Sequence, residues 1–150
     1  MTSVADFDAV ILDIGGTVVV EAAPATATGQ LVVTYLPRVI DDLAVLAGQV
    51  RLAAATNTAV MTESDGRDLL GAHGVSDLLE VIVTSADVGA AKPDPAVLTV
   101  ALERLDNMPP ERALYIGDKD TDQLAASAIG MPFAWVHPAG ILAAIEHHRH

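Results

Sequence analysis

A chain of 150 residues, 51% of them hydrophobic, is long enough to bury the core of one domain. Its 20 acidic residues outnumber 8 basic ones, and the formal net charge of −12 argues against nucleic acid as a partner. The sequence contains no cysteine, which excludes a disulfide framework and thiolate chemistry.

The N-terminal residues do not have the features of a targeting segment. Residues 1–8 carry two aspartates and lack the basic segment and apolar run of a signal peptide. No apolar stretch approaches the ~20 residues that a membrane-spanning helix needs. We therefore expect a cytoplasmic protein that does not associate with a membrane.

Five short apolar runs bounded by turn residues predict the strands of a sheet. They are residues 10–12, 50–55, 79–83, 113–116 and 133–136. Helical periodicity appears between them, over about 37–47, over 96–105 and over 124–129. Asp94 is the predicted N-cap of the second helix, with Pro95 at its first position, and Gly130 is the predicted left-handed C-cap of the third.

This alternation predicts an α/β fold: a single doubly wound, Rossmann-like parallel sheet of about five strands, with helices on both faces. Residues 18–36 do not fit the pattern and are interpreted as a loop or flap over the end of the first strand. Residues 146–150 are interpreted as a solvated helix end. Because the sequence has no internal repeat or linker, residues 1–150 are expected to form one domain.

Polar residues follow four of the predicted strands at the point where each strand ends. The carboxyl ends of parallel strands share one edge of the sheet, where open α/β sheets bind ligands. Residues that are far apart in the sequence are therefore expected to converge there. They are Asp13 with Gly15 and Gly16, Thr56 with Asn57, Lys92, and Asp118 with Asp122.

The carboxylates in this set suit phosphoryl transfer. Asp13 could attack phosphorus and form an aspartyl phosphate. Asp118 and Asp122 could hold Mg²⁺ directly or through water, because this cation takes oxygen ligands. Each carboxylate also has a structural explanation, in a strand-ending turn or at a helix N-terminus, but their order along successive strands favours a site.

The remaining polar residues could stabilise the charge of a phosphate group. Lys92, the hydroxyl group of Thr56, and turn amides near Gly16 and Asn57 would supply the electrostatic stabilisation that such reactions need. Taken singly, Thr56 with Asn57 could be a loop or cap pair, and Lys92 a solvated lysine before a helix. The same edge is therefore predicted to bind phosphate.

These motifs resemble those of the haloacid dehalogenase (HAD) superfamily of phosphohydrolases, and in particular its phosphoglycolate-phosphatase-like branch. The sequences VTSADVGAAKPDP, ending at Pro95, and YIGDKDTDQLAASAIGM, ending at Met131, are similar to the third and fourth signatures of that branch. Four signatures occur in order, at residues 13–17, 56–57, 92–93 and 117–122. The resemblance extends over nearly the whole chain.

The resemblance implies a role for each matching position. Asp13 would be the nucleophile, and Thr56 and Lys92 would bind the phosphate. Mg²⁺ would be held by Asp13, Asp118 and the backbone carbonyl group of Gly15. Asp122 would assist from the acidic cluster.

One departure from the family pattern is the absence of room for a cap domain. Only 38 residues, 18–55, separate Thr17 from Thr56, and part of them is predicted core helix and strand. An uncapped site should be open, or covered by a partner subunit in a homodimer. An uncapped site of this kind favours a large or protein-borne phosphorylated substrate.

A second departure is Gly15, where phosphatases of this family typically have an aspartate that protonates the leaving group. Loss of such an acid commonly lowers the rate by ~10²–10⁴-fold. Three consequences stay open: the substrate has a good leaving group, as an acyl phosphate does; another acid such as Glu21 replaces the aspartate; or turnover is lost. The sequence therefore allows a weak or selective phosphohydrolase, or a catalytically impaired phosphate-binding or protein-interaction module.

Two other families share part of the pattern. The glycine turn after Asp13 resembles the phosphate loop of actin-like sugar kinases, but those need two larger lobes. A response-regulator receiver domain also combines Asp, Thr and Lys-Pro around Mg²⁺, but there the acidic pair precedes the phosphorylated aspartate. Here the acidic residues, Asp118 and Asp122, follow the lysine, so the order differs.

Overall fold

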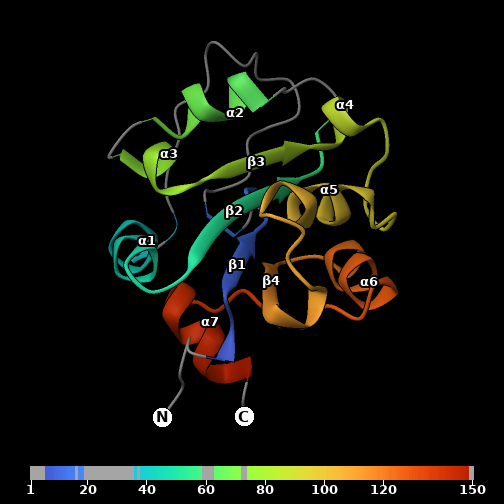
Figure 1. Cartoon of the computed structure of the whole chain (residues 1–150). Coiled ribbons are helices and arrows are strands. Elements are labelled where there is room, and N and C mark those ends of the chain that lie inside the picture. Colours follow the sequence, from blue (N-terminus) through green and yellow to red (C-terminus); the bar gives the residue numbers. More distant parts are fainter. Residues whose placement is uncertain are drawn as a thin grey trace.

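A computed structural model describes residues 6–15, 17–18, 36, 38–58, 63–71 and 74–148. Within them, five parallel strands form one sheet in the order β3-β2-β1-β4-β5 (Figure 1). They are β1 (Ala9–Leu12), β2 (Arg51–Thr56), β3 (Val81–Thr84), β4 (Ala113–Gly117) and β5 (Phe133–Trp135). Each strand overlaps the apolar run that predicted it, and the predicted parallel sheet is confirmed.

Strand β1 lies at the centre of the sheet, between β2 and β4. Leu12, its last residue, is in register with Ala54 of β2 and Ile116 of β4. All of its residues are buried, as expected for a strand covered on both faces. The backbone N–H of Asp13 donates to the carbonyl oxygen of Ile116 at 3.0 Å, which fixes Asp13 where the strands end. We call this side of the sheet the carboxyl edge.

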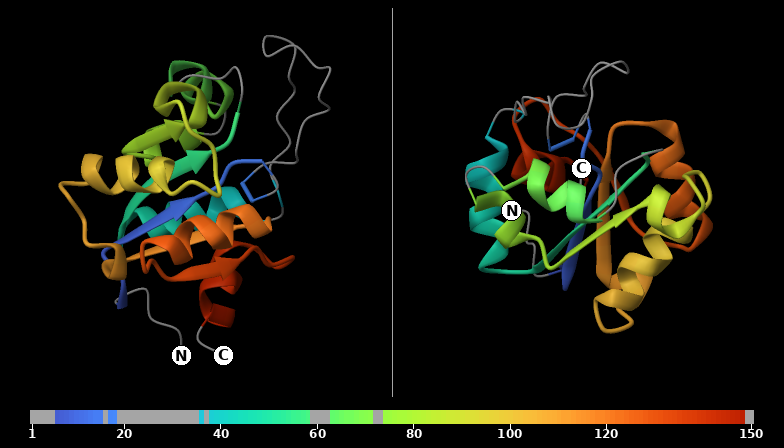
Figure 2. Two further views of the ribbon diagram at one scale, coloured as in Figure 1. Left: turned by 90° about the vertical axis from the view of Figure 1, so that its right-hand side faces the viewer. Right: turned by 90° about the horizontal axis from the view of Figure 1, so that it is seen from above.

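Helices cover both faces of the sheet. One face is covered by α1 (Val39–Ala47), α2 (Glu63–Leu69), α3 (Val75–Leu78) and α7 (Ile141–His148). The other carries α5 (Ala96–Arg104) and α6 (Asp120–Ala128), which lie across the near face in the left view of Figure 2. The short helix α4 (Ser85–Val88) and a 3₁₀ turn (Pro110–Arg112) complete the described elements. None of the described helices is long and apolar enough to span a membrane.

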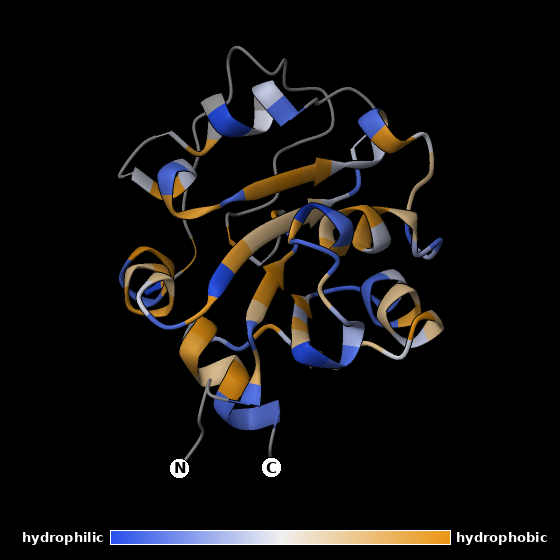
Figure 3. Cartoon of the chain, in the orientation of Figure 1, coloured by the Kyte–Doolittle hydropathy of each residue, from blue (hydrophilic) through white to orange (hydrophobic). Residues whose placement is uncertain are grey.

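The side chains of each strand alternate between two hydrophobic cores. In β1, Val10 and Leu12 join the core under α1 and α7, whereas Ala9 and Ile11 join the core under α5 and α6. In Figure 3, β1 and β3 are hydrophobic along their length, and hydrophilic residues gather on the surrounding helices and connections. The expectation of helices on both faces is therefore confirmed.

Helix α5 begins one residue later than predicted. Ala96 is its first residue, and Pro95 occupies the N-cap position. The carboxylate of Asp94 still accepts a hydrogen bond from the backbone N–H of Ala96 at 2.9 Å. Asp94 therefore satisfies a free amide at the helix start, as predicted, but from outside the cap position.

The helical periodicity over 124–129 predicts one buried apolar face for α6, and this prediction is wrong in part. Leu124 is 56% exposed, and Ala128 is also exposed. Ala125 and Ala126 are buried in the core, and Asp122 is buried on the same side of the helix. The helix is thus oriented by a buried carboxylate as well as by apolar residues. Gly130 has φ of 68°, which confirms the predicted left-handed conformation after this helix.

Most of the predicted flap lies outside the described residues. Of residues 18–36, the structure describes Val18 and Leu36, which are joined by a 3.0 Å hydrogen bond from the N–H of Leu36 to the carbonyl oxygen of Val18. The expected absence of a cap therefore stays a prediction. At the predicted solvated C-terminus, α7 continues to His148, and His147 stacks on His137 with 4.2 Å between ring centroids.

Candidate active site

The carboxyl edge brings together the polar residues that were predicted to converge. Asp13 follows β1, Thr56 ends β2, and Lys92 lies in the connection between α4 and α5. These three residues are buried, each with 5% of its surface exposed. Asp118 follows β4, and Asp122 lies in the first turn of α6. Gly15 is partly exposed in the turn after Asp13, whereas Gly16 lies outside the described residues.

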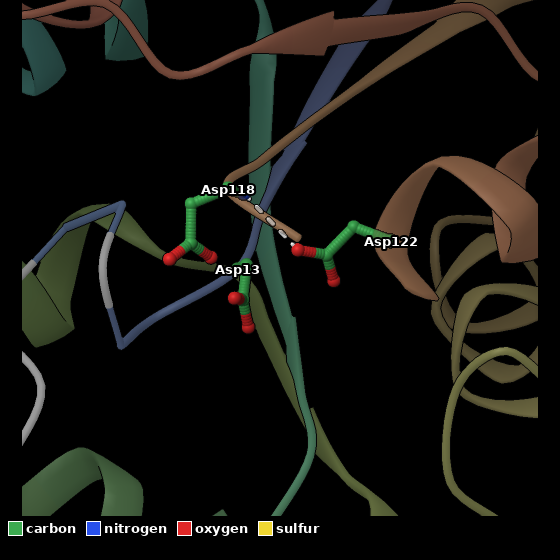
Figure 4. Close-up of side chains that lie close together, drawn as sticks. All are labelled: Asp13, Asp118 and Asp122. Atoms are coloured by element: carbon green, nitrogen blue, oxygen red, sulfur yellow. Dashed lines mark hydrogen bonds between the residues drawn. The ribbon is translucent and has the colours of Figure 1, made fainter. Parts of the chain in front are cut away.

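Three carboxylates form the centre of this site. Asp13, Asp118 and Asp122 each place an oxygen atom within 4.8 Å of the others. In Figure 4 the carboxylates of Asp13 and Asp118 lie next to each other, and Asp122 approaches from α6. Among the described residues, Oδ1 of Asp118 is buried and has no hydrogen-bond partner. An oxygen-rich cluster with a free acceptor has the donor set of a divalent cation site.

Lys92 carries the positive charge within this cluster. Its Nζ donates to Oδ1 of Asp122 at 2.5 Å and to Oδ1 of Asp13 at 3.2 Å. It also donates to the hydroxyl oxygen of Tyr115 at 2.6 Å and lies 3.4 Å from the carbonyl oxygen of Ala55. Two carboxylates therefore contact this ammonium group, and with Asp118 the acidic side chains of the cluster outnumber its one lysine.

Asp122 holds both the lysine and the turn that carries Asp118. Its Oδ2 accepts the backbone N–H groups of Asp118 and Lys119, both at 3.1 Å, and its Oδ1 accepts from Lys92. A Cβ atom at Gly117 would lie 2.5–2.7 Å from the Asp122 side chain. Only glycine at position 117 therefore allows this carboxylate to reach the turn.

Asn57 fixes the main chain of Lys92. Its Oδ1 accepts the N–H of Lys92 at 2.8 Å, and its Nδ2 donates to the carbonyl oxygen of Lys92 at 3.1 Å. The sequence indicated a role for backbone amides near Asn57, and nothing in the residues signalled this clamp by the side chain. The two bonds bring Lys92 to the end of β2, where Thr56 also lies.

Burial dominates the electrostatics of the site. It raises the pKa of Asp13 from 3.8 to about 6, with Lys92 acting against the shift and the carboxylates of Asp122 and Asp118 adding to it. Burial also raises the pKa of Asp118, and the Asp122 charge adds to the increase. Both carboxyl groups are thus less acidic than in water. Bringing a cation to them would favour their ionised forms.

Tyr115 is a site residue that the sequence analysis missed. It belongs to β4, is fully buried, and places its hydroxyl group against Lys92 and Asp122. A tyrosine inside an otherwise apolar strand was the available signal, because a buried hydroxyl group needs a hydrogen-bond partner. Its partners could not be identified before the strand order was known.

Together these residues provide a fixed cation beside a buried carboxylate, in a cluster with excess negative charge. Such a cluster can bind a divalent metal ion, and Asp13 could attack an electrophile that approaches the carboxyl edge. Perturbed pKa values of this kind are common at functional sites.

Known proteins share this fold and parts of this sequence. A phosphoglycolate phosphatase from Cereibacter sphaeroides is 36% identical over 84 residues, which cover 56% of this chain and 36% of that protein. The chain matches only 24–45% of the length of the curated relatives.

Solved structures agree on the fold. A HAD-superfamily hydrolase of subfamily IA from Geobacter sulfurreducens superposes with a TM-score of 0.70 at 20% identity, over 85% of this chain and 88% of that one. CbbY from Rhodobacter sphaeroides in complex with phosphate gives 0.67 at 19% identity, over 86% and 85%. A family model for haloacid dehalogenase-like hydrolases matches residues 31–136. The chain therefore belongs to the haloacid dehalogenase-like hydrolase family.

Proposed function

We propose that this protein is a Mg²⁺-dependent phosphohydrolase that acts through an aspartyl phosphate on Asp13. The observation that carries the proposal is the position of Asp13: it is buried at the carboxyl edge, 3.2 Å from Lys92, within a cluster of three carboxylates. The family membership and the phosphatases among its relatives support the same chemistry.

The reaction would proceed in two steps. A carboxylate oxygen of Asp13 attacks phosphorus, and the bond from phosphorus to the leaving-group oxygen breaks with its electron pair on that oxygen. Water then attacks the phosphorus of the aspartyl phosphate, which releases inorganic phosphate and restores Asp13. Lys92 and the hydroxyl group of Thr56 would stabilise the charge on the transferred group.

The donor set fits Mg²⁺. Asp13 and Asp118 would hold the ion together with the carbonyl group of Gly15, and the unpartnered Oδ1 of Asp118 supports this choice. Asp122, whose oxygens already accept three hydrogen bonds, from Lys92 and from the backbone N–H groups of Asp118 and Lys119, would anchor the site and contact the ion only through water. Bound Mg²⁺ would offset the repulsion between the nucleophile and an anionic phosphate.

The substrate would be a phosphate with a good leaving group. Gly15 provides no acid, and the ammonium group of Lys92, which contacts Asp13, is engaged by Asp122 and Tyr115 in the buried cluster. An acyl phosphate releases a carboxylate, which needs no proton at neutral pH. The candidate acid Glu21 lies outside the described residues. If the protein has no cap domain, the site would either be open to a large substrate or be covered by the second subunit of a homodimer.

A substrate panel tests the function. We expect Mg²⁺-dependent phosphate release from acetyl phosphate, and a loss of at least ~10³-fold in Asp13→Asn. Asp8→Asn, the same change at an exposed ion pair on the far side of the sheet, is the control and should keep full activity. In Gly15→Asp, release from phosphoglycolate should rise by up to ~10²-fold while acetyl phosphate hydrolysis changes little. Absence of turnover above Asp13→Asn on every substrate would refute an active phosphohydrolase and favour a phosphate-binding module.

A further inference from the structure

We propose that Tyr115 is a positioning residue, whose hydroxyl group holds the Lys92 ammonium group beside Asp122 and prevents it from closing on Asp13. This inference deepens the proposed function, since it rests on a need for Asp13 to keep its oxygens available. It assigns a task to a buried polar group that the reaction steps do not use.

The geometry of the ammonium group is the first support. Lys92 has three N–H protons and four oxygen acceptors within 3.4 Å. The two short contacts, 2.5 and 2.6 Å, are to Asp122 and to the hydroxyl group of Tyr115. The contacts to Asp13 and to the Ala55 carbonyl oxygen are longer, 3.2 and 3.4 Å. The lysine therefore lies closer to Asp122 and Tyr115 than to Asp13, to which it still donates.

The proton of the tyrosine hydroxyl group explains this asymmetry. Its nearest acceptor is the carbonyl oxygen of Ala55, at 2.8 Å, whereas Oδ1 of Asp122 is at 3.2 Å. With that proton on Ala55, a lone pair of the hydroxyl oxygen faces Nζ of Lys92. Tyr115 thus donates to the carbonyl oxygen of Ala55, and its own hydroxyl oxygen is an uncharged acceptor for Lys92. Without it, the free proton of the ammonium group would turn to Ala55 or to the charged carboxylate of Asp13.

The ring of Tyr115 is fixed independently of its hydroxyl group. It is fully buried in β4 and packs against Phe133, with 6.1 Å between ring centroids. Nζ of Lys92 lies 5.3 Å from the centroid of the tyrosine ring and 2.6 Å from its hydroxyl oxygen, so the ammonium group lies beyond the hydroxyl group and not over the face of the ring. Tyr115→Phe should therefore remove the hydrogen bonds and leave the packing of the ring in place.

Crystal structures of the wild type and of Tyr115→Phe test the proposal directly. In the variant we expect Nζ of Lys92 to move toward Asp13, with a shorter contact to its carboxylate than in the wild type. An unchanged Lys92 position would overturn the proposal. Thermal unfolding checks that the variant is folded.

Titration with Mg²⁺ provides a functional readout that does not depend on turnover. A lysine closer to Asp13 competes with the metal ion, so the dissociation constant for Mg²⁺ should rise by about 3- to 10-fold in Tyr115→Phe, with a similar fall in kcat for acetyl phosphate and little change in KM. Phe133→Leu, which loosens the packing of the tyrosine ring but keeps its hydroxyl group, should leave both values near wild type. Equal losses in both variants would assign Tyr115 a packing role only. If the wild type does not hydrolyse acetyl phosphate, the proposed function fails for that substrate, whereas the Lys92 position still decides the role of Tyr115.

Discussion

The two edges of the sheet arrange their charged residues differently. At the amino edge, where the strands begin, Arg112 pairs with Asp8 at 3.0 Å and Arg51 pairs with Glu80 at 2.9 Å, and all four side chains are at least 35% exposed. At the carboxyl edge, Lys92 contacts two carboxylates of a cluster of three, and its side chain is 2% exposed. The first arrangement pairs opposite charges in water, and the second buries carboxylates that outnumber their one lysine.

This difference indicates where function lies. Exposed ion pairs contribute little to stability and lose little when they are broken. Burying like charges opposes folding, and a fold keeps such a cluster only where another requirement maintains it. The comparison predicts that equivalent substitutions have unequal effects at the two edges.

Replacing the buried lysine should give the largest difference in stability between the two edges. Lys92→Met leaves Asp13 and Asp122 buried beside each other without their cation, and the unfolding free energy should fall by about 3–5 kcal/mol at neutral pH. Arg112→Met breaks an exposed pair and should cost much less. Urea denaturation without metal measures both. Equal losses would show that burial does not distinguish the two edges.

A glycine substitution tests how tightly the carboxyl edge is packed. In Gly117→Ala, the new methyl group would lie 2.5–2.7 Å from Asp122, so the side chain must move, at a cost of about 1–3 kcal/mol and with weaker Mg²⁺ binding. Gly48, after α1, is the control, because a Cβ atom there would meet only the Val45 carbonyl oxygen, at 3.6 Å. Gly48→Ala should fold and bind Mg²⁺ as the wild type does. A fully stable Gly117→Ala would contradict the close approach of Asp122.

The pH dependence of stability should have opposite signs at the two edges. Asp13 has a raised pKa of about 6, against an ordinary 3.8, so the folded protein retains a proton that the unfolded chain releases between these values. The unfolding free energy therefore falls as pH rises through this window. Without metal, Asp13→Asn should be more stable than the wild type by about 3 kcal/mol above pH 6, and this advantage should fade as pH approaches 3.8.

Asp8 provides the opposite case. Its hydrogen bonds to Arg112 lower its pKa, so its carboxylate stabilises the fold above its ordinary pKa, and that contribution is lost as pH falls through the lowered value. Asp8→Asn should therefore be slightly less stable than the wild type at neutral pH and equal to it in acid. Denaturation curves across pH, measured on both variants, would contradict the comparison if their differences had the same sign.

Much of the fold could be predicted because its strands are short apolar runs that each end in turn residues. The polar residues that follow these runs also identified Asp13, Lys92 and Asp118 as residues of one edge of the sheet. The sequence did not indicate the partners of Asp122, because its burial depends on the tilt of α6 and on the absence of a side chain at Gly117.

Other features depended on contacts between distant residues. The clamp by Asn57 joins residues 35 positions apart, and the hydroxyl group of Tyr115 reaches Ala55, 60 positions away, across the neighbouring strand β1. Periodicity reports which face a residue occupies but not which side chain lies opposite. The partners of these two side chains therefore depend on tertiary packing, which the local sequence pattern does not report.

The most direct test of the central claim is to trap the phosphorylated protein. The protein is mixed with ³²P-labelled acetyl phosphate and Mg²⁺, quenched in acid and cleaved, and the labelled peptide is identified by mass spectrometry. We predict a phosphoryl group on Asp13 that is absent without Mg²⁺ and absent in Asp13→Asn. Label on a different residue, or Mg²⁺-dependent phosphate release that persists in Asp13→Asn, would contradict the account.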